Sequence, residues 1–167
     1  MMKEDFMKIA IVYYSKTGNT KKVAELIAEG ANTNENVEAK CISIEEVDKE
    51  FLMEAKTVIF GSPTIYGTYS WQIKQWLDSA RSVKLGGKLG AVFATASFVG
   101  GGAELAELAL IAELLVIGML VYSSGVAEGQ PFIHYGPVCI QEGDEGQKER
   151  ARIFGERIAK KTVELFN

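Results

Sequence analysis

A short turn near the N-terminus gathers the residue types that bind a phosphate group. The stretch YYSKTGNT, Tyr13–Thr20, lies between an apolar run and a helical pattern. Its hydroxyl and amide side chains are those of Ser15, Thr17, Asn19 and Thr20. Gly18 lets the backbone curl round a ligand because it carries no Cβ. Backbone N–H groups at a helix N-terminus lack partners and lie at the positive end of the helix dipole, so the turn predicts a phosphate site.

The same residues fit a second interpretation, in which an Asn or Thr caps the helix on a glycine turn and no ligand binds. Positive charge comes from Lys16, Lys21 and Lys22, and the sequence does not show which way these side chains point. Other site motifs are absent, since the chain has no GxxxxGKS/T, no GxGxxG after its first apolar run and no GxSxG. A P-loop NTPase, the usual dinucleotide fingerprint and a serine-hydrolase elbow are therefore excluded.

Strand and helix patterns alternate five times along the chain. Strands are predicted at residues 8–14, 37–43, 57–61, 88–96 and 119–124. Helices are predicted at about 19–30, 70–80, 103–117 and 144–166, with a further acidic helical segment at 44–55. Parallel strands need right-handed crossovers, so helices must cover both faces of one open sheet. The fold class is α/β, a doubly wound three-layer sandwich, in a single domain of residues 1–167.

Small polar residues gather where such a sheet binds its ligand. In open parallel sheets, ligands bind beyond the carboxyl ends of the strands, at the point where the strand order reverses. Three loops expected at these ends, 15–20, 62–69 and 97–102, are rich in Gly, Ser and Thr, and the loop at 124–139 is the longest. We therefore expect the site at this edge.

Composition narrows the class of protein. The formal net charge of −4 over 167 residues argues against nucleic acid as a partner. No apolar run is long enough to span a membrane, and the N-terminal MMKEDF lacks a signal-peptide core, so we expect a cytoplasmic protein. Cys41, Cys139 and the single His134 do not form a metal pattern. Free thiols are expected, and a disulfide between the two cysteines is left open.

The stretch IVYYSKTGNTKKVAELI, Ile11–Ile27, resembles the phosphate loop of the flavodoxins. The residues that match the family's spacing are Ser15, Gly18, Thr20, Ala24 and Ile27. GSPTIYG and GGGAE are similar to the second and third flavin loops of the NAD(P)H:quinone oxidoreductases related to the Trp-repressor-binding protein, and Tyr135-Gly136 resembles that family's late loop. The resemblance covers most of the chain. It implies a flavodoxin-like sheet of five parallel strands in the order 2-1-3-4-5, with FMN as cofactor.

The resemblance also implies where FMN lies, with its phosphate on the first turn and its ring between the loops at 63–67 and 95–101. The cofactor-binding residues would be Ser15, Lys16, Thr17, Gly18, Asn19, Thr20, Pro63, Thr64, Ile65, Tyr66, Gly67, Thr95, Ala96, Ser97, Phe98, Gly100 and Gly101. Ile65 and Tyr66 offer apolar or flat surface to a ring, although Tyr66 also fits an exposed loop aromatic. Phe98 either covers the ring or folds back on the sheet. Trp71 would contact the ring or a partner subunit, whereas Trp76 would belong to the core.

The loops expected around the ring contain no Asp or Glu. Carboxylates near a flavin disfavour its anionic reduced form and lower its potential, so a neutral site favours a flavin that meets small substrates. We therefore expect an FMN-dependent oxidoreductase that passes electrons from NAD(P)H to a quinone or similar small acceptor, with a homodimer near Trp71. The alternative is a flavodoxin-type carrier of electrons between redox proteins.

Three departures from the reductase family favour that alternative. Ile117 stands where the family has a His thought to serve the acceptor, an aromatic residue expected before the fourth strand is absent from SARSVKLGG, and the family's insertion after the second strand is missing. His134 lies on a different loop, where it either serves an acceptor pocket or is solvated. No acid–base catalyst is predicted, because a flavin carries out hydride chemistry itself.

Overall fold

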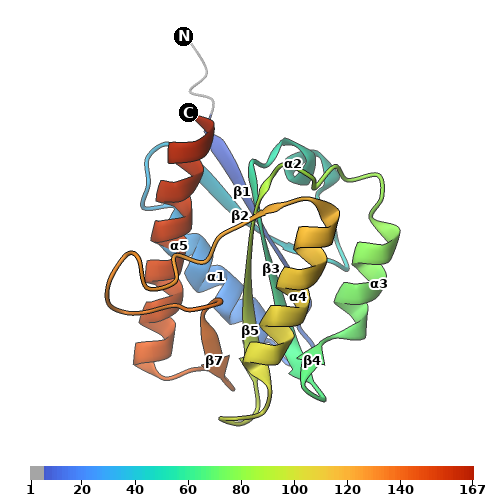
Figure 1. The fold of residues 1–167 in the computed structure, drawn as a ribbon, viewed down its shortest axis with the longest axis vertical. Helices are drawn as coiled ribbons and strands as arrows, with labels where there is room; N and C mark the ends of the chain where they lie inside the picture. Colours follow the sequence, from blue (N-terminus) through green and yellow to red (C-terminus); the bar gives the residue numbers. More distant parts are fainter. Residues whose placement is uncertain (1–5) are drawn as a thin grey trace.

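An open sheet separates two layers of helices in the computed structural model, which describes residues 6–167 (Figure 1). The strands are β1 Met7–Tyr13, β2 Val37–Ser43, β3 Thr57–Ile65, β4 Thr68–Tyr69, β5 Leu89–Ala96, β6 Leu120–Val121 and β7 Val138–Ile140. The helices are α1 Asn19–Ala31, α2 Lys49–Glu54, α3 Trp71–Ser79, α4 Ala103–Ile117 and α5 Glu145–Phe166. The helical patterns in the sequence therefore predicted every helix to within a few residues, apart from the longer span assigned to α2.

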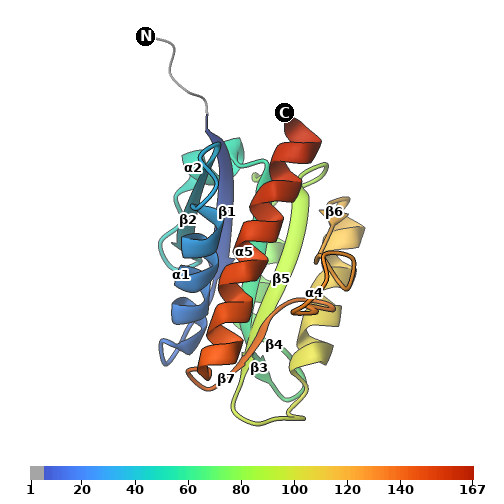
Figure 2. The same ribbon diagram turned by 90° about the vertical axis from the view of Figure 1, so that its left-hand side faces the viewer.

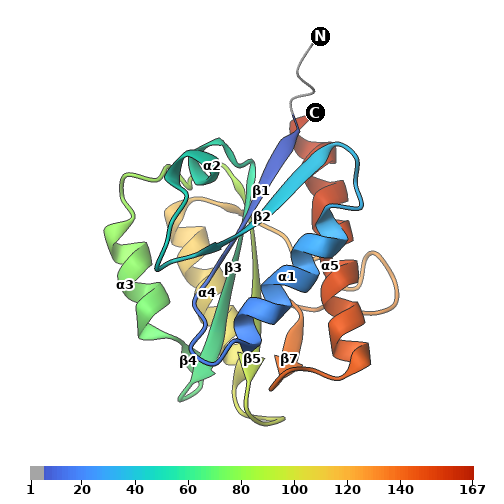
Figure 3. The ribbon, with the colours of Figure 1, turned by 180° about the vertical axis from the view of Figure 1, so that it is seen from behind.

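The sheet runs in the order β2-β1-β3-β5-β6, with these strands parallel. Because β5 is the fourth predicted strand and β6 begins the fifth, the predicted order 2-1-3-4-5 is confirmed. α1 and α5 cover one face, and α2, α3 and α4 cover the other (Figures 2 and 3). The fold is the predicted flavodoxin-like α/β sandwich.

β1 lies in the interior of this sandwich and is buried on both faces. Ile9 and Ile11 pack in the core beneath α1 and α5, whereas Ala10 and Val12 pack in the core beneath α2, α3 and α4. All four side chains are fully buried. This double burial explains why the strand is a continuous apolar run rather than an alternating one. It also fixes the position from which the polar turn after Tyr13 leaves the sheet.

The fifth strand is shorter than the prediction of 119–124. β6 ends at Val121, and the same edge of β5 is then occupied further along by β7. Between them the chain leaves the sheet, where Ser124 and Gly125 both have positive φ angles, of 65° and 50°. A strand cannot continue through such residues, so this edge is built from two segments that are distant in sequence.

The predicted loop at 62–69 is largely regular structure. β3 continues to Ile65 and pairs with β4 in an antiparallel hairpin. Tyr66 and Gly67 form its two-residue tip, with φ angles of 47° and 75°. Positive φ at both central residues is the pattern of a type I′ turn, which matches the natural twist of a hairpin. Tyr66 is therefore held at a fixed point beyond the sheet.

Both cysteines are free thiols, as expected from the sequence. Burial raises the pKa of the Cys41 thiol to about 12 and that of Cys139 to about 11. Both thiols are therefore protonated at neutral pH and are weak nucleophiles.

None of the helices within residues 6–167 is long and apolar enough to cross a membrane. Residues 1–5 of the charged N-terminal stretch, on which the expectation about export depended, lie outside the described residues.

Helix α4 carries one acidic side chain on its buried face. Glu107 is 1% exposed, and its Oε1 has no hydrogen-bond partner among residues 6–167. Burial raises the pKa of this carboxyl well above its ordinary value of 4.5, and the nearby charge of Glu104 raises the pKa further. Glu107 is thus neutral in the folded protein at pH values where it is ionised in the unfolded chain.

This difference predicts that stability falls as the pH rises above the ordinary carboxyl pKa. Above about pH 4.5 the folded state keeps a proton that the unfolded state has lost, which lowers the free energy of unfolding by up to ~1.4 kcal/mol per pH unit until the raised pKa is reached. Glu107→Gln, which cannot titrate, should flatten this part of the profile. Denaturant unfolding at a series of pH values measures it, and parallel profiles for the two proteins would contradict the prediction.

Candidate functional site

A cleft of about 340 Å³ opens at the carboxyl edge of the sheet. It lies between the β1–α1 turn, the ends of β3 and β5, and the first residues of α3. Its lining residues are Tyr14, Lys16, Thr17, Asn19, Thr20, Pro63, Thr64, Ile65, Trp71, Gln72, Thr95, Ala96, Ser97 and Gln141. The edge chosen from topology is therefore the edge that carries the cleft.

The β1–α1 turn directs the N-terminus of α1 towards this cleft. Gly18 is the N-cap residue, with a φ of 99° that a residue with a Cβ rarely adopts. Its N–H donates a hydrogen bond to Ser15 Oγ at 3.1 Å, which closes the turn. No side chain caps α1, so the capping interpretation of Asn19 or Thr20 is not realised. In the part of the chain that the structure describes, the first-turn amides therefore have no side-chain partner, which is the condition that favours an anion.

A buried hydrogen bond joins the turn to the end of β5. Thr20 Oγ1 and Thr95 Oγ1 lie 2.8 Å apart. The two residues are only 2% and 4% exposed. Because a buried hydroxyl that loses its partner is costly, this pair keeps the two walls of the cleft in register.

The end of β3 forms the third wall, through Pro63, Thr64 and Ile65. The hydroxyl of Thr64 is buried and has no hydrogen-bond partner within the described residues. Ser62 holds the base of the hairpin, because its Oγ accepts a hydrogen bond of 2.8 Å from Ser70 N–H. The wall is therefore rigid, yet it leaves one hydroxyl that a polar ligand group can satisfy.

Ten of the predicted cofactor residues line the cleft, and seven do not. Ser15 and Gly18 shape the turn behind it. Tyr66 is fully exposed at the hairpin tip, and Phe98 is 74% exposed. The remaining three residues are Gly67, Gly100 and Gly101. The second and third loops nevertheless touch, because a Cβ on Gly102 would lie 2.8 Å from the Cα of Gly67.

Three lining residues were not predicted from the sequence. Tyr14 lies at the start of the β1–α1 turn, whereas the sequence pattern predicts it as the last residue of the first strand. Gln72 lies on α3, next to Trp71. Gln141 follows β7, and its Nε2 donates a hydrogen bond to the Ser97 carbonyl at 3.4 Å. Since β7 was not predicted, no signal in the sequence pointed to Gln141. Trp71 does line the cleft.

The cleft has no acidic side chain among its lining residues, and Lys16 is the charged residue there. This agrees with the neutral loops noted in the sequence. His134 does not line the cleft. It lies beside a separate cavity next to α4 and α5. An arrangement of hydroxyls, amides and apolar surface without an acid–base pair can hold a phosphate and a flat group, but offers no proton-transfer catalyst.

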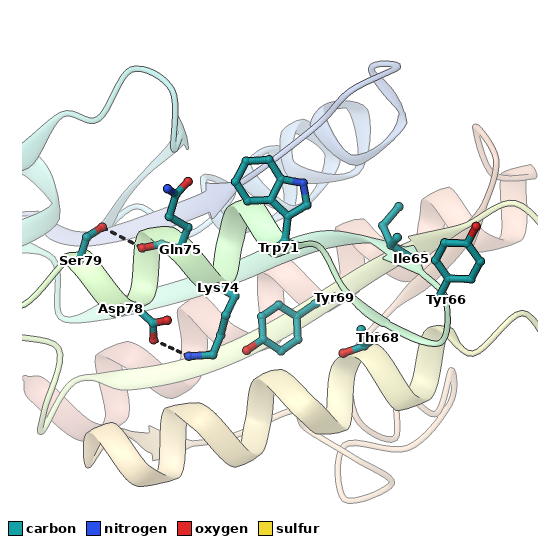
Figure 4. A pocket seen from close by; sticks show the side chains of 9 residues that line it. All are labelled: Ile65, Tyr66, Thr68, Tyr69, Trp71, Lys74, Gln75, Asp78 and Ser79. Atoms are coloured by element: carbon teal, nitrogen blue, oxygen red, sulfur yellow. Dashed lines mark hydrogen bonds and ion pairs between the residues drawn. The ribbon is translucent and has the colours of Figure 1, made fainter.

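A larger open groove adjoins the cleft and shares Ile65 and Trp71 with it (Figure 4). On its floor, Tyr69 donates a hydrogen bond to Glu113, which also accepts one from Lys74. Burial and this hydrogen bond raise the pKa of Tyr69. Trp76, one turn further along α3 than Gln72, packs against Phe60 with ring centroids 6.0 Å apart, which is the core position predicted for it.

Comparisons with known proteins agree with this geometry. Residues 11–115 match the sequence model of the Flavodoxin family. A flavodoxin of Clostridium saccharobutylicum is 50% identical over 160 residues, which cover 96% of this chain and 100% of the relative. An NAD(P)H dehydrogenase (quinone) of Archaeoglobus fulgidus is 28% identical over 188 residues, which cover 95% of this chain and 98% of the relative.

A solved structure with a similar fold points to the same family. The crystal structure of a flavodoxin, WrbA-like protein from Agrobacterium tumefaciens superposes with a TM-score of 0.78 at 25% identity. The match covers 95% of this chain and 98% of that protein. The family model spans more than half of the chain, and the Clostridium relative matches it along its whole length. The chain therefore belongs to the flavodoxin family.

Proposed function

We propose that this protein binds FMN in the cleft and carries electrons between redox proteins. The observation that carries the proposal is the uncapped N-terminus of α1, which faces a cleft lined by hydroxyls and by no acidic side chain. Likeness to a flavodoxin at 50% identity supports the same function. When bound, FMN supplies the redox chemistry, and the protein contributes binding, orientation and electrostatics.

The residues present fit such a cofactor. The amides of the first turn of α1, with Thr17 and Asn19, would hold the phosphate. Thr64 would give its buried, unpartnered hydroxyl to a polar group of the cofactor. Ile65 and Trp71, which line the cleft, would supply apolar surface to the ring. None of these roles requires a residue to exchange a proton.

Exposed aromatic side chains near the cleft would form the docking surface for a redox protein. Trp71 is 66% exposed, and Tyr66 and Phe98 project further from the fold. Exposed apolar patches of this kind mark interaction sites. The homodimer expected near Trp71 would use the same surface, and it stays a prediction.

A second candidate function is reduction of a quinone or similar small acceptor by NAD(P)H, which the sequence analysis placed first. The absence of acid among the lining residues of the cleft favours it, as does the 28% identity to an NAD(P)H dehydrogenase (quinone). The carrier is preferred because its relative is nearly twice as similar in sequence.

Phosphate binding by the first turn can be tested by removing one hydroxyl. Thr17→Ala should weaken FMN binding about ten- to a hundredfold, since a hydrogen bond to a charged group contributes about 1.5–3 kcal/mol. Thr17→Ser, which keeps the hydroxyl, should bind nearly as tightly as the wild type. Calorimetric titration of the apoprotein measures both, and equal affinities for the alanine and serine variants would argue against the assignment.

Mixing the FMN-loaded protein with NADPH under anaerobic conditions separates the two functions. A carrier should stay yellow for minutes with NADPH or NADH alone and should bleach once a reductase protein is added. Rapid bleaching by a nicotinamide nucleotide alone, followed by reoxidation with benzoquinone, would instead establish the second candidate.

A further inference from the structure

A separate cavity of about 250 Å³ lies between α4, α5 and the segment that connects β6 to β7. In Figure 2 this segment passes between α5 and α4. The cavity is lined by Glu104, Glu107, Gln130, Phe132, Ile133, His134, Tyr135, Gly136, Val138 and Arg150. It shares no lining residue with the cleft. Its volume is several times the ~30 Å³ of one water molecule in the liquid, so it can hold more than a structural water.

The inner wall of this cavity presents a carboxyl group that lacks a partner. Oε1 of Glu107 makes no hydrogen bond within the described residues, although the side chain is 1% exposed. A Cβ on Gly136 would lie 2.6 Å from this oxygen and 2.1 Å from the Val92 carbonyl oxygen of β5, so the carboxyl group meets the connecting segment where that segment passes the edge of the sheet. A buried acceptor without a donor costs about 1–3 kcal/mol, and few are found in native proteins. Glu107 is therefore suited to a ligand that donates hydrogen bonds.

A second carboxylate belongs to the same wall. Glu104 precedes Glu107 by three positions on α4, a spacing that puts both side chains on neighbouring parts of one helix face. The two acids together favour a donor that is also a cation. No group of three His, Cys, Asp or Glu side chains within residues 6–167 is arranged to hold a metal ion. An organic ammonium group, with its N–H donors, suits the wall better than a metal.

A basic side chain from another helix also lines the cavity. Arg150 reaches it from α5, and within residues 6–167 its guanidinium forms no ion pair. A guanidinium presents a planar fork of donors that matches a carboxylate. Phe132, Ile133 and Val138 add apolar side chains to the lining. The cavity thus combines two acidic side chains from α4, a basic side chain from α5 and apolar surface.

We propose that this cavity binds a small zwitterion, an apolar α-amino acid. Its ammonium group lies against Glu104 and Glu107, its carboxylate lies against Arg150, and its side chain packs on Phe132, Ile133 and Val138. This site is independent of FMN, so it is compatible with either function proposed for the cleft.

Binding should release a proton. Burial raises the pKa of Glu107 in the free protein, and an ammonium group beside it lowers that pKa again by favouring the ionised carboxylate. The other titratable or charged groups facing the cavity are Glu104 on α4, His134 and Tyr135 on the connecting segment, and Arg150 on α5. β5, packed beneath, brings the Val92 carbonyl rather than a titratable group. Affinity should therefore increase as the pH rises from the ordinary carboxyl pKa of 4.5 towards the raised pKa of Glu107, and level off above it.

The test is a thermal-shift screen of the FMN-loaded full chain against the twenty amino acids, followed by calorimetric titration of those that stabilise it. At least one apolar amino acid should bind saturably, and the amine that lacks its carboxylate should bind at least tenfold more weakly. Glu107→Gln and Arg150→Gln should each raise the dissociation constant at least tenfold. Glu156→Gln, an exposed α5 change outside the cavity, should leave it unaltered.

Two results would overturn the proposal. One is the absence of any stabilisation by the twenty amino acids, and the other is unchanged affinity in the Arg150→Gln variant, which alters an exposed residue and should fold normally. The FMN absorbance spectrum, recorded in every variant, distinguishes the two sites. Loss of amino-acid binding with an unchanged FMN spectrum counts against the cavity alone. Loss of FMN binding counts against the cleft alone, because the amino-acid titrations still test the cavity.

Discussion

The hydrogen bond between Thr20 and Thr95 is the contact on which the geometry of the cleft depends. The two hydroxyls lie 2.8 Å apart although the residues are 75 positions apart in the chain. β1 and β5 are not neighbours in the sheet, because β3 lies between them. The bond therefore crosses the carboxyl end of β3 and fixes the first turn of α1 against the far wall. Loss of either hydroxyl would leave the other buried without a partner, at a cost of about 1–3 kcal/mol.

Burial of β1 on both faces gives that bond a fixed base. Its side chains alternate between the core beneath α1 and α5 and the core beneath the other helices, so the strand cannot slide without exposing both sets. α1 and α5 also pack very closely, since a Cβ on Gly155 would lie 2.0 Å from the Ile27 carbonyl oxygen. The helix N-terminus that faces the cleft is consequently held from behind as well as at its tip.

Local chemistry made much of this arrangement predictable from the sequence. An apolar run followed by Ser, Thr, Gly and Asn specified both a buried strand and a turn of the type that favours an anion, and alternation of strands and helices specified the edge where the turn lies. Pairing between strands that are distant in the sequence was harder to predict. β7 is three residues long and adds to β5 only after an excursion from the sheet, so neither it nor Gln141 was predicted.

The sequence pattern also could not predict which single polar groups are buried. Glu107 stands in a run of Ala and Leu and gives no sign that it faces a cavity, because its position depends on the segment that closes over α4. Tyr66 is the opposite case, a fully exposed side chain for which the sequence suggested a contact with a ring. Its neighbours Pro63 and Gly67 suggested a ring-binding loop, but a hairpin turn carries the side chain fully into solvent. The sequence identifies residue types at an edge, and the turn geometry decides which of them face inwards.

The central claim is that the uncapped first turn of α1 anchors the ligand through its phosphate. Calorimetric titration of the apoprotein with FMN and, separately, with riboflavin tests it most directly, because the two compounds differ only in that group. The account predicts that FMN binds with one-to-one stoichiometry and at least a hundredfold more tightly than riboflavin. Equal affinities, or no binding of FMN, would contradict it.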